Sequence, residues 1–153
     1  DNHILPWTAH PDANPFDVLR TKIYLLMKEH GWKRLAITSP DKGCGKSTLA
    51  CNLAAGFTRQ QELKSLLFDF DLRRPSVARL LGMEPEHDIA KLVTDDARAV
   101  RRNVDCTLIV AGAGQTRIGR LDVCEREVAE LTNVVGVVLN SCRHIEPSDS
   151  YYY

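Results

Sequence analysis

Apolar residues along this chain follow two spacings, one helical and one suited to buried strands. They recur at helical spacing between Phe16 and Met27, and residues 47–60 are rich in alanine and leucine, so each stretch predicts a helix. Short, almost wholly apolar runs predict buried strands instead. These runs cover residues 34–39, 65–71, 105–111 and 134–140. Further helices are predicted at residues 75–82, 94–102 and 121–131.

Strands and helices therefore alternate along the chain. Because the strands are apolar on both faces, this pattern indicates an α/β fold, with a parallel sheet and helices on both faces. Ligands in such folds bind beyond the carboxyl ends of the strands. The first expected strand leads into a glycine-rich loop, the second ends at Asp69 and Asp71, and the last ends at Asn140. We expect the functional site at this edge of the sheet.

Composition limits the classes of protein that the chain can represent. Its 153 residues, 44% of them apolar, suit one domain. Lysine plus arginine equals aspartate plus glutamate, at 20 each, which argues against a nucleic-acid partner. No apolar run reaches the roughly 18 residues of a membrane span, and the N-terminus lacks the pattern of a signal peptide. The five cysteines show no C-x-x-C spacing, so we expect reduced thiols and a cytoplasmic protein.

The glycine-rich loop reads SPDKGCGKST over residues 39–48 and predicts a phosphate-binding loop. Glycines allow the backbone to curl so that several N–H groups face phosphate oxygens, and the next helix presents its positive end to the anion. Lys46 adds a charge toward the β and γ phosphates, and the Ser47 hydroxyl can bind Mg²⁺. Pro40 stands where the pattern G-x-x-x-x-G-K-[ST] has glycine. Cys44 is expected to fill a small-residue position in the loop.

A second candidate feature is the pair of carboxylates in LLFDFDLRRP. Asp69 and Asp71 are two residues apart, and alternate side chains of a strand share a face. Both can therefore face the phosphate loop. Such carboxylates hold Mg²⁺ or its waters, and one can accept a proton from an attacking hydroxyl.

These two motifs together resemble a family. ITSPDKGCGKST followed by LLFDFDLRRPS is similar to the Walker A and A′ motifs of the bacterial tyrosine kinases (BY-kinases), which belong with the capsule and exopolysaccharide chain-length proteins. VDCTLIVAGAGQT and GVVLN resemble later segments of the same domain, and the closing tyrosines resemble its autophosphorylated tail. The resemblance implies a P-loop fold of the MinD/ParA type. The non-periodic start, with its two prolines, predicts an N-terminal arm or linker (1–14), which precedes a kinase domain (15–142) and a tyrosine-rich tail (143–153).

The resemblance also implies roles for individual residues. Lys46, Asp69 and Asp71 would be catalytic, and Ser47, Asp69 and Asp71 would bind Mg²⁺. Asn140 would lie near adenine. The ATP-binding residues would be Lys42, Gly43, Cys44, Gly45, Lys46, Ser47, Thr48 and Asn140. The phosphate acceptors would be Tyr151, Tyr152 and Tyr153, phosphorylated in trans within a homo-oligomer. The family works with a membrane-embedded co-polymerase partner or a transmembrane domain, which implies a place at the inner face of the plasma membrane.

The chain departs from the family pattern in two places. Nothing between Asp71 and Asp105 matches the Walker B strand, which ends in D-x-P-P, so the fold is expected to be a shortened version. The first helix has Asn14, Asp17 and Arg20 where the family often has E-x-x-R-x-x-R for subunit packing. Two alternatives to an autokinase therefore stay open. One is a non-catalytic nucleotide-binding regulator of polysaccharide export, and the other is a MinD/ParA-type positioning ATPase.

Overall fold

The computed structural model describes residues 14–60, 63–71, 74–84 and 103–142. The expected arm before Asn14, the expected helix at residues 94–102 and the tyrosine-rich tail lie outside the described residues. The helices are α1 (Asn14–His30), α2 (Lys46–Thr58), α3 (Val77–Leu80) and α5 (Ile118–Ala129). The strands are β1 (Leu35–Thr38), β2 (Cys106–Gly112) and β3 (Asn133–Asn140). The sequence predicted each of these elements to within a few residues.

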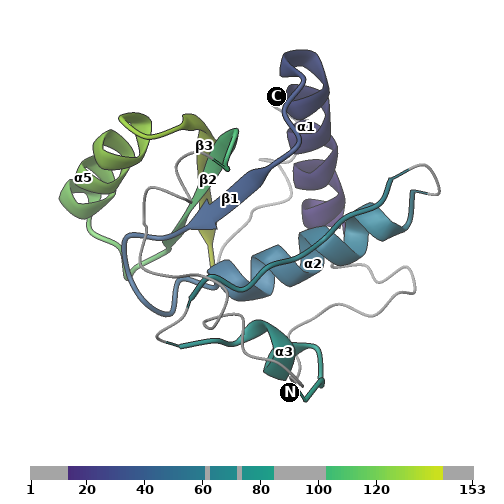
Figure 1. Ribbon diagram of the computed structural model, residues 1–153. Coiled ribbons are helices and arrows are strands. Elements are labelled where there is room, and N and C mark those ends of the chain that lie inside the picture. Colours follow the sequence, from purple (N-terminus) through teal and green to yellow (C-terminus); the bar gives the residue numbers. More distant parts are fainter. Residues whose placement is uncertain (1–13, 61–62, 72–73, 85–102, 143–153) are drawn as a thin grey trace.

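The strands form a parallel sheet in the order β1-β2-β3. In Figure 1, α1 and α2 lie on one side of this sheet and α5 lies on the other, so the predicted α/β architecture is confirmed. Strand β2 lies in the centre, and all seven of its residues are buried. The register aligns Thr38 with Ile109 and Gly112 with Asn140, so the carboxyl ends of all three strands meet at one edge.

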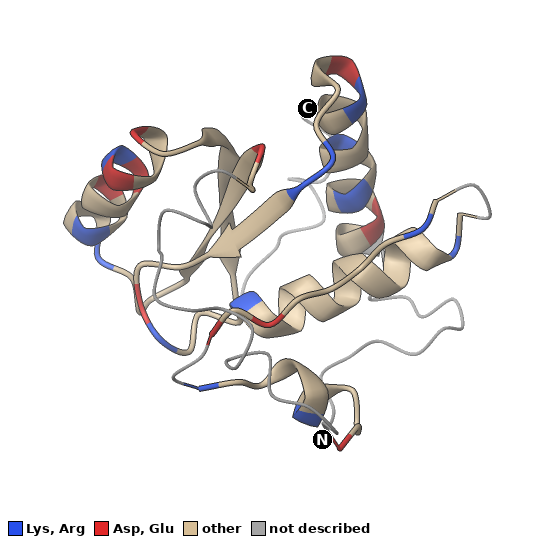
Figure 2. Cartoon of the chain, in the orientation of Figure 1, with Lys and Arg blue, Asp and Glu red and all other residues tan. Residues whose placement is uncertain are grey.

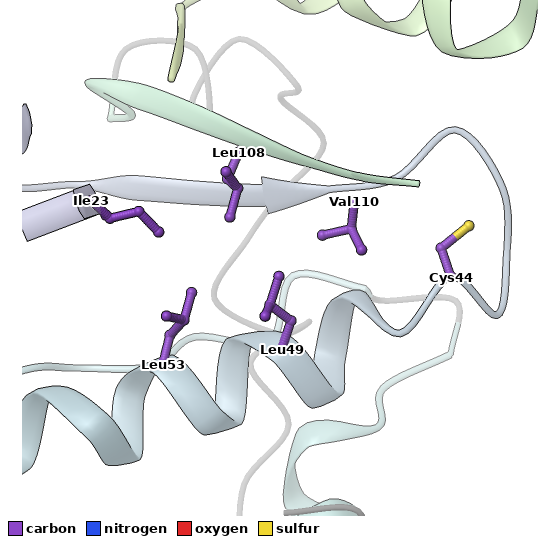
Figure 3. Packing of buried hydrophobic residues seen from close by; sticks show 6 residues of the cluster. All are labelled: Ile23, Cys44, Leu49, Leu53, Leu108 and Val110. Atoms are coloured by element: carbon purple, nitrogen blue, oxygen red, sulfur yellow. The ribbon is translucent and has the colours of Figure 1, made fainter. Parts of the chain in front are cut away.

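The core lies between β2 and α2. Leu49 and Leu53, one helical turn apart, point from α2 toward Leu108 and Val110 of β2 (Figure 3). Ile23 of α1 joins the same cluster, and Cys44 closes it at the end of the loop. Alanine and leucine favour the helix, and burial of its apolar face fixes it under the sheet. This packing holds the N-terminus of α2 beside the carboxyl ends of the strands.

The strand predicted at residues 65–71 is not formed, so this prediction is wrong. The segment has no strand partner among the described residues, and the described sheet ends at β1. Its side chains alternate between half-buried and exposed, and the exposed ones include Leu66, Phe68 and Phe70 at 84%, 56% and 51%. An apolar run becomes a strand only when a neighbouring strand supplies backbone hydrogen bonds. Apolar content alone could not reveal that this partner is missing among the described strands.

Within the described part of the chain, no helix combines the length and the apolar content needed to cross a membrane. All five cysteines are free, and three of them, Cys44, Cys51 and Cys106, are buried.

Candidate functional site

The glycine-rich loop leads from β1 into the first turn of α2. Gly43 and Gly45 have φ angles of 79° and 84°, which non-glycine residues rarely adopt. A Cβ atom on Gly45 would also overlap the side-chain amide of Asn140. The helix starts directly after this glycine, and no side chain caps it. The first-turn N–H groups of α2 have no acceptor within the helix, so they and the helix dipole favour an anion here.

Lys46 is the first residue of α2 and the only charged residue in that helix, which is otherwise uncharged in Figure 2. Its Nζ donates to Asp71 Oδ2 at 2.7 Å, and both side chains are about one-third exposed. This hydrogen bond and the charge of Lys46 hold the pKa of Asp71 below its ordinary value. Asp71 Oδ1 accepts the backbone N–H of Arg74 at 3.1 Å. The loop lysine and the A′ carboxylate are therefore in direct contact.

Asp69 organises the backbone behind this pair. Its Oδ2 accepts the N–H groups of Ser76 and Val77 at 2.7 and 3.0 Å, at the start of α3. Its Oδ1 accepts the N–H of Asp71 at 3.1 Å. Asp69 and Asp71 both lie on the half-buried side of their segment. The carboxylate of Asp69 fixes the orientation of Asp71 and the position of α3.

Ser76 is a site residue that the sequence reasoning missed. Its hydroxyl donates to Ser47 Oγ at 2.8 Å, so it contacts the side chain expected to bind Mg²⁺. One feature of the sequence could have drawn attention to Ser76. It stands just after Pro75 at the start of a predicted helix, where serine often caps the helix. Here the Asp69 side chain takes the capping contact, which leaves the serine hydroxyl directed at Ser47.

Three more side chains reach the loop, one from β3, one from the turn after β2 and one from α5. Asn140 Nδ2 donates to the carbonyl of Cys44 at 3.0 Å, and Gln115 Nε2 donates to that of Lys42 at 2.6 Å. Arg120 donates to the carbonyl of Pro40 at 3.2 Å and forms an ion pair with Asp41 at 2.8 Å. Sequence reasoning selected Asn140 and missed Gln115 and Arg120. The one available signal was that Gln115 closely follows the end of a predicted strand.

The residues present fit a nucleoside triphosphate with Mg²⁺. An uncapped helix start, a loop lysine and a helix-start hydroxyl lie together, with two carboxylates within reach of them. The described residues hold no group of three or more His, Cys, Asp or Glu side chains that could bind a metal ion. Mg²⁺ that keeps its waters and binds phosphate oxygens needs only one or two protein ligands. Ser47 and the carboxylates are suited to that role.

Of the predicted site residues, Lys46, Ser47, Asp69 and Asp71 are linked through direct contacts or through Ser76. Cys44 is buried and its Sγ lies 3.5 Å from Thr116 Oγ1, as expected for a packing residue of the loop. The carbonyl of Thr48 accepts the side-chain amide of Asn52 at 2.9 Å, within α2. The three predicted phosphate acceptors at 151–153 lie outside the described residues.

Comparisons with known proteins agree with this geometry. The family described as "CobQ/CobB/MinD/ParA nucleotide binding domain" matches residues 35–147. This stretch begins with β1 and includes the loop, both carboxylates and all three strands. The kinase domain of Escherichia coli tyrosine kinase ETK has the same fold, with a TM-score of 0.73 and 17% sequence identity. That likeness covers 100% of this chain and 87% of the other.

Two kinds of curated relative match part of the chain. Tyrosine-protein kinase YwqD of Bacillus subtilis is 42% identical over 73 residues, which are 48% of this chain and 30% of that protein. An iron-sulfur cluster carrier protein of Pyrococcus abyssi is 39% identical over 69 residues, which are 44% of this chain and 23% of that protein. The matched part spans less than a third of either relative. The resemblance to bacterial tyrosine kinases is confirmed, and an iron-sulfur carrier shows a similar level of identity.

Proposed function

The chain belongs to the CobQ/CobB/MinD/ParA family of nucleotide-binding domains, and we propose that it is an ATP-dependent protein-tyrosine autokinase. The observation that carries the proposal is the contact between Lys46 and Asp71 at the uncapped start of α2. It brings a phosphate-binding cation and a carboxylate to one point. The tyrosine tail favours a kinase over other uses of this site, because three of the four tyrosines stand at positions 151–153.

The proposed reaction moves the γ-phosphoryl group of ATP to a tyrosine hydroxyl. The bond between the γ-phosphorus and the oxygen that bridges it to the β-phosphate breaks, and a bond to the tyrosine oxygen forms. ADP leaves, and the Asp69–Asp71 pair takes the hydroxyl proton. The loop N–H groups and Lys46 bind the phosphates, and Mg²⁺ when bound supplies neutralising charge. Ser47 and the carboxylates would hold that ion.

The proposal also includes a biological setting for this reaction. We place phosphorylation of residues 151–153 in trans, between subunits of a homo-oligomer at the inner face of the plasma membrane. A membrane-embedded co-polymerase would connect it to capsule or exopolysaccharide synthesis and export. These elements rest on the resemblance to the bacterial tyrosine kinases.

The iron-sulfur carrier relatives support a second candidate, an ATP-dependent carrier of a cluster as cargo. Cys142 is the exposed cysteine. Because several thiolates hold a cluster, Cys142 would have to share this cargo with a second copy of the chain. Anaerobic reconstitution with iron and sulfide separates the two candidates. Stable, stoichiometric iron that is lost in Cys142→Ser would favour the carrier.

The first test of the proposal is intact mass after incubation with Mg·ATP, with and without phosphatase. We expect gains of one to three phosphates on Tyr151, Tyr152 or Tyr153, and no gain when all three are replaced by phenylalanine. Lys46→Ala should lose ATP binding, whereas the triple phenylalanine variant should bind ATP like the wild type. Unchanged ATP affinity in Lys46→Ala would contradict the site assignment.

The other outcomes point to the alternatives. ATP turnover without phosphotyrosine would indicate a positioning ATPase. ATP binding without turnover, with a partner domain supplied, would indicate a non-catalytic regulator of polysaccharide export.

A further inference from the structure

Three side chains from outside the glycine-rich loop donate to three alternate carbonyls of it. Arg120 donates to the carbonyl of Pro40, Gln115 to that of Lys42, and Asn140 to that of Cys44, at 3.2, 2.6 and 3.0 Å. We call Gln115, Arg120 and Asn140 the carbonyl clamp. They come from the turn after β2, from α5 and from the end of β3, so elements that follow β1 and α2 in the chain hold the loop.

Fixing these carbonyls also fixes the direction of three amides. A trans peptide unit is planar, so its C=O and the N–H of the next residue point in opposite directions. The carbonyls of Pro40, Lys42 and Cys44 belong to the same peptide units as the N–H groups of residues 41, 43 and 45. With each carbonyl directed at the clamp, these three N–H groups point away from it. A row of N–H groups on one side of a loop is what binds phosphate oxygens.

Glycines next to the carbonyl clamp leave room for its side chains. A Cβ atom on Gly112 would lie 3.1 Å from Gln115 Oε1 and 3.3 Å from its Cβ, tighter than ordinary contact. Gly45 leaves room for the amide of Asn140 in the same way. Arg120 also pairs with Asp41, whose side chain is mostly buried. The glycines therefore serve the clamp as well as the backbone turn.

We infer that Gln115, Arg120 and Asn140 are positioning residues that preorganise the phosphate loop through its carbonyls. The inference rests on the proposed nucleotide binding of the same loop and deepens it. For Asn140 it adds a role in the loop to the place near adenine that the resemblance implies. Loss of one clamp contact should loosen the loop and weaken binding of the phosphate chain, with or without the base.

The test compares Gln115→Met, which keeps the side-chain length and removes the donor, with the wild type. ¹⁵N order parameters of Asp41, Gly43 and Gly45 measure loop motion without any ligand. Titration with Mg·ADP and with Mg·pyrophosphate measures phosphate-chain affinity. We expect lower order parameters at these residues and roughly threefold to tenfold weaker binding of both probes, the worth of one hydrogen bond.

Arg120→Met and its matched control Arg126→Met separate the clamp from simple loss of charge. Both remove one cation from α5, but Arg126 bonds to Asp122 one turn away. Only Arg120→Met should loosen the loop, and Arg120→Lys should restore part of the affinity. A fall in the melting temperature without these changes would indicate a merely structural role and overturn the inference.

The two proposals fail in different ways. A wild-type protein that binds neither Mg·ADP nor Mg·pyrophosphate would refute the proposed function, and the order parameters would still decide the clamp. Unchanged order parameters in both Gln115→Met and Arg120→Met would refute the clamp even if the wild type binds ATP well.

Discussion

At the scale of single residues, the ion pair between Lys46 and Asp71 lies at the centre of the proposed site. The lysine that should meet the phosphates already has a carboxylate partner at 2.7 Å. Because Lys46 lowers the pKa of Asp71, this carboxylate stays ionised at neutral pH. A nucleotide must therefore displace Asp71 from Lys46 or share the lysine with it. A partly exposed pair of this kind is worth about 0–1 kcal/mol, so the cost is modest.

Asp71→Asn should affect nucleotide binding differently with and without Mg²⁺. In excess EDTA we expect ATP to bind about two to five times more tightly, because Lys46 is released and a negative charge near the phosphates is removed. With Mg²⁺ present this gain should shrink or reverse, because a carboxylate expected to hold the ion is lost. Calorimetric titration in both buffers measures the two affinities.

Asp69→Asn is the control for this prediction. Asp69 accepts three backbone N–H groups, so in EDTA its substitution should mainly lower the melting temperature by disturbing α3. With Mg²⁺ present it should also weaken ATP binding, because Asp69 is a proposed ligand of the ion. Equal ATP affinities in EDTA for the wild type and Asp71→Asn would show that the ion pair does not compete with phosphate.

At the scale of elements, Asp105 ties the start of β2 to the start of β1. Its Oδ2 accepts the N–H groups of Lys33 and Arg34 at 2.8 and 2.9 Å, and its Oδ1 accepts from the Arg34 guanidinium at 2.9 Å. The Arg34 contact, followed by the Lys33 N–H, lowers the pKa of Asp105 to about 2. This carboxylate holds the parallel pair in register at the edge opposite the site.

This pKa predicts how stability depends on pH. The ordinary value is 3.8, so the ionised carboxylate stabilises the fold fully above that pH and loses its effect as the pH falls through about 2. Asp105→Asn should cost about 1 kcal/mol near pH 6, and the difference from the wild type should shrink between pH 4 and 2. Urea unfolding at each pH measures it. A constant difference over that range would contradict the assignment.

Polar side chains of α1 form contacts inside the same chain. Arg20 donates to Asp17 at 2.8 Å and to the carbonyl of Gly56 in α2 at 3.1 Å. The family often uses these positions for subunit packing, and the sequence departs from that pattern; in the structure Arg20 joins α1 to α2. Pattern reasoning found the helix, because its apolar spacing is local. It could not find this contact, because the partner lies 36 residues away.

The distance in sequence between contacting residues also explains which parts of the site could be predicted. Lys46, Ser47 and the loop glycines lie within one short motif whose chemistry is local, so they were recognisable. Gln115 and Arg120 lie more than seventy residues from the carbonyls they contact, and only the parallel register brings them there. The wrong prediction of a strand at residues 65–71 has the same cause, because strand formation depends on a partner elsewhere in the chain.

At the scale of the whole molecule, that segment leaves an exposed apolar row of Leu66, Phe68 and Phe70. Alternation places the three side chains on one side of the extended segment, and the two rings stack with centroids 6.0 Å apart. Exposed apolar side chains gathered in this way bind hydrophobic dyes and promote self-association. They contribute little to the free energy of unfolding, because folding removes little of their surface from water.

Replacing all three residues of this row by threonine should therefore leave stability almost unchanged while removing surface hydrophobicity. We expect the free energy of unfolding to change by about 0.5 kcal/mol or less per residue, against about 2–5 kcal/mol for Leu108→Ala in the core. Fluorescence of a bound anilinonaphthalene dye should fall clearly. Urea unfolding and dye titration of the two variants measure both effects. A loss of stability comparable to that of Leu108→Ala would mean that the row is covered in solution, because only buried apolar surface carries a penalty of that size.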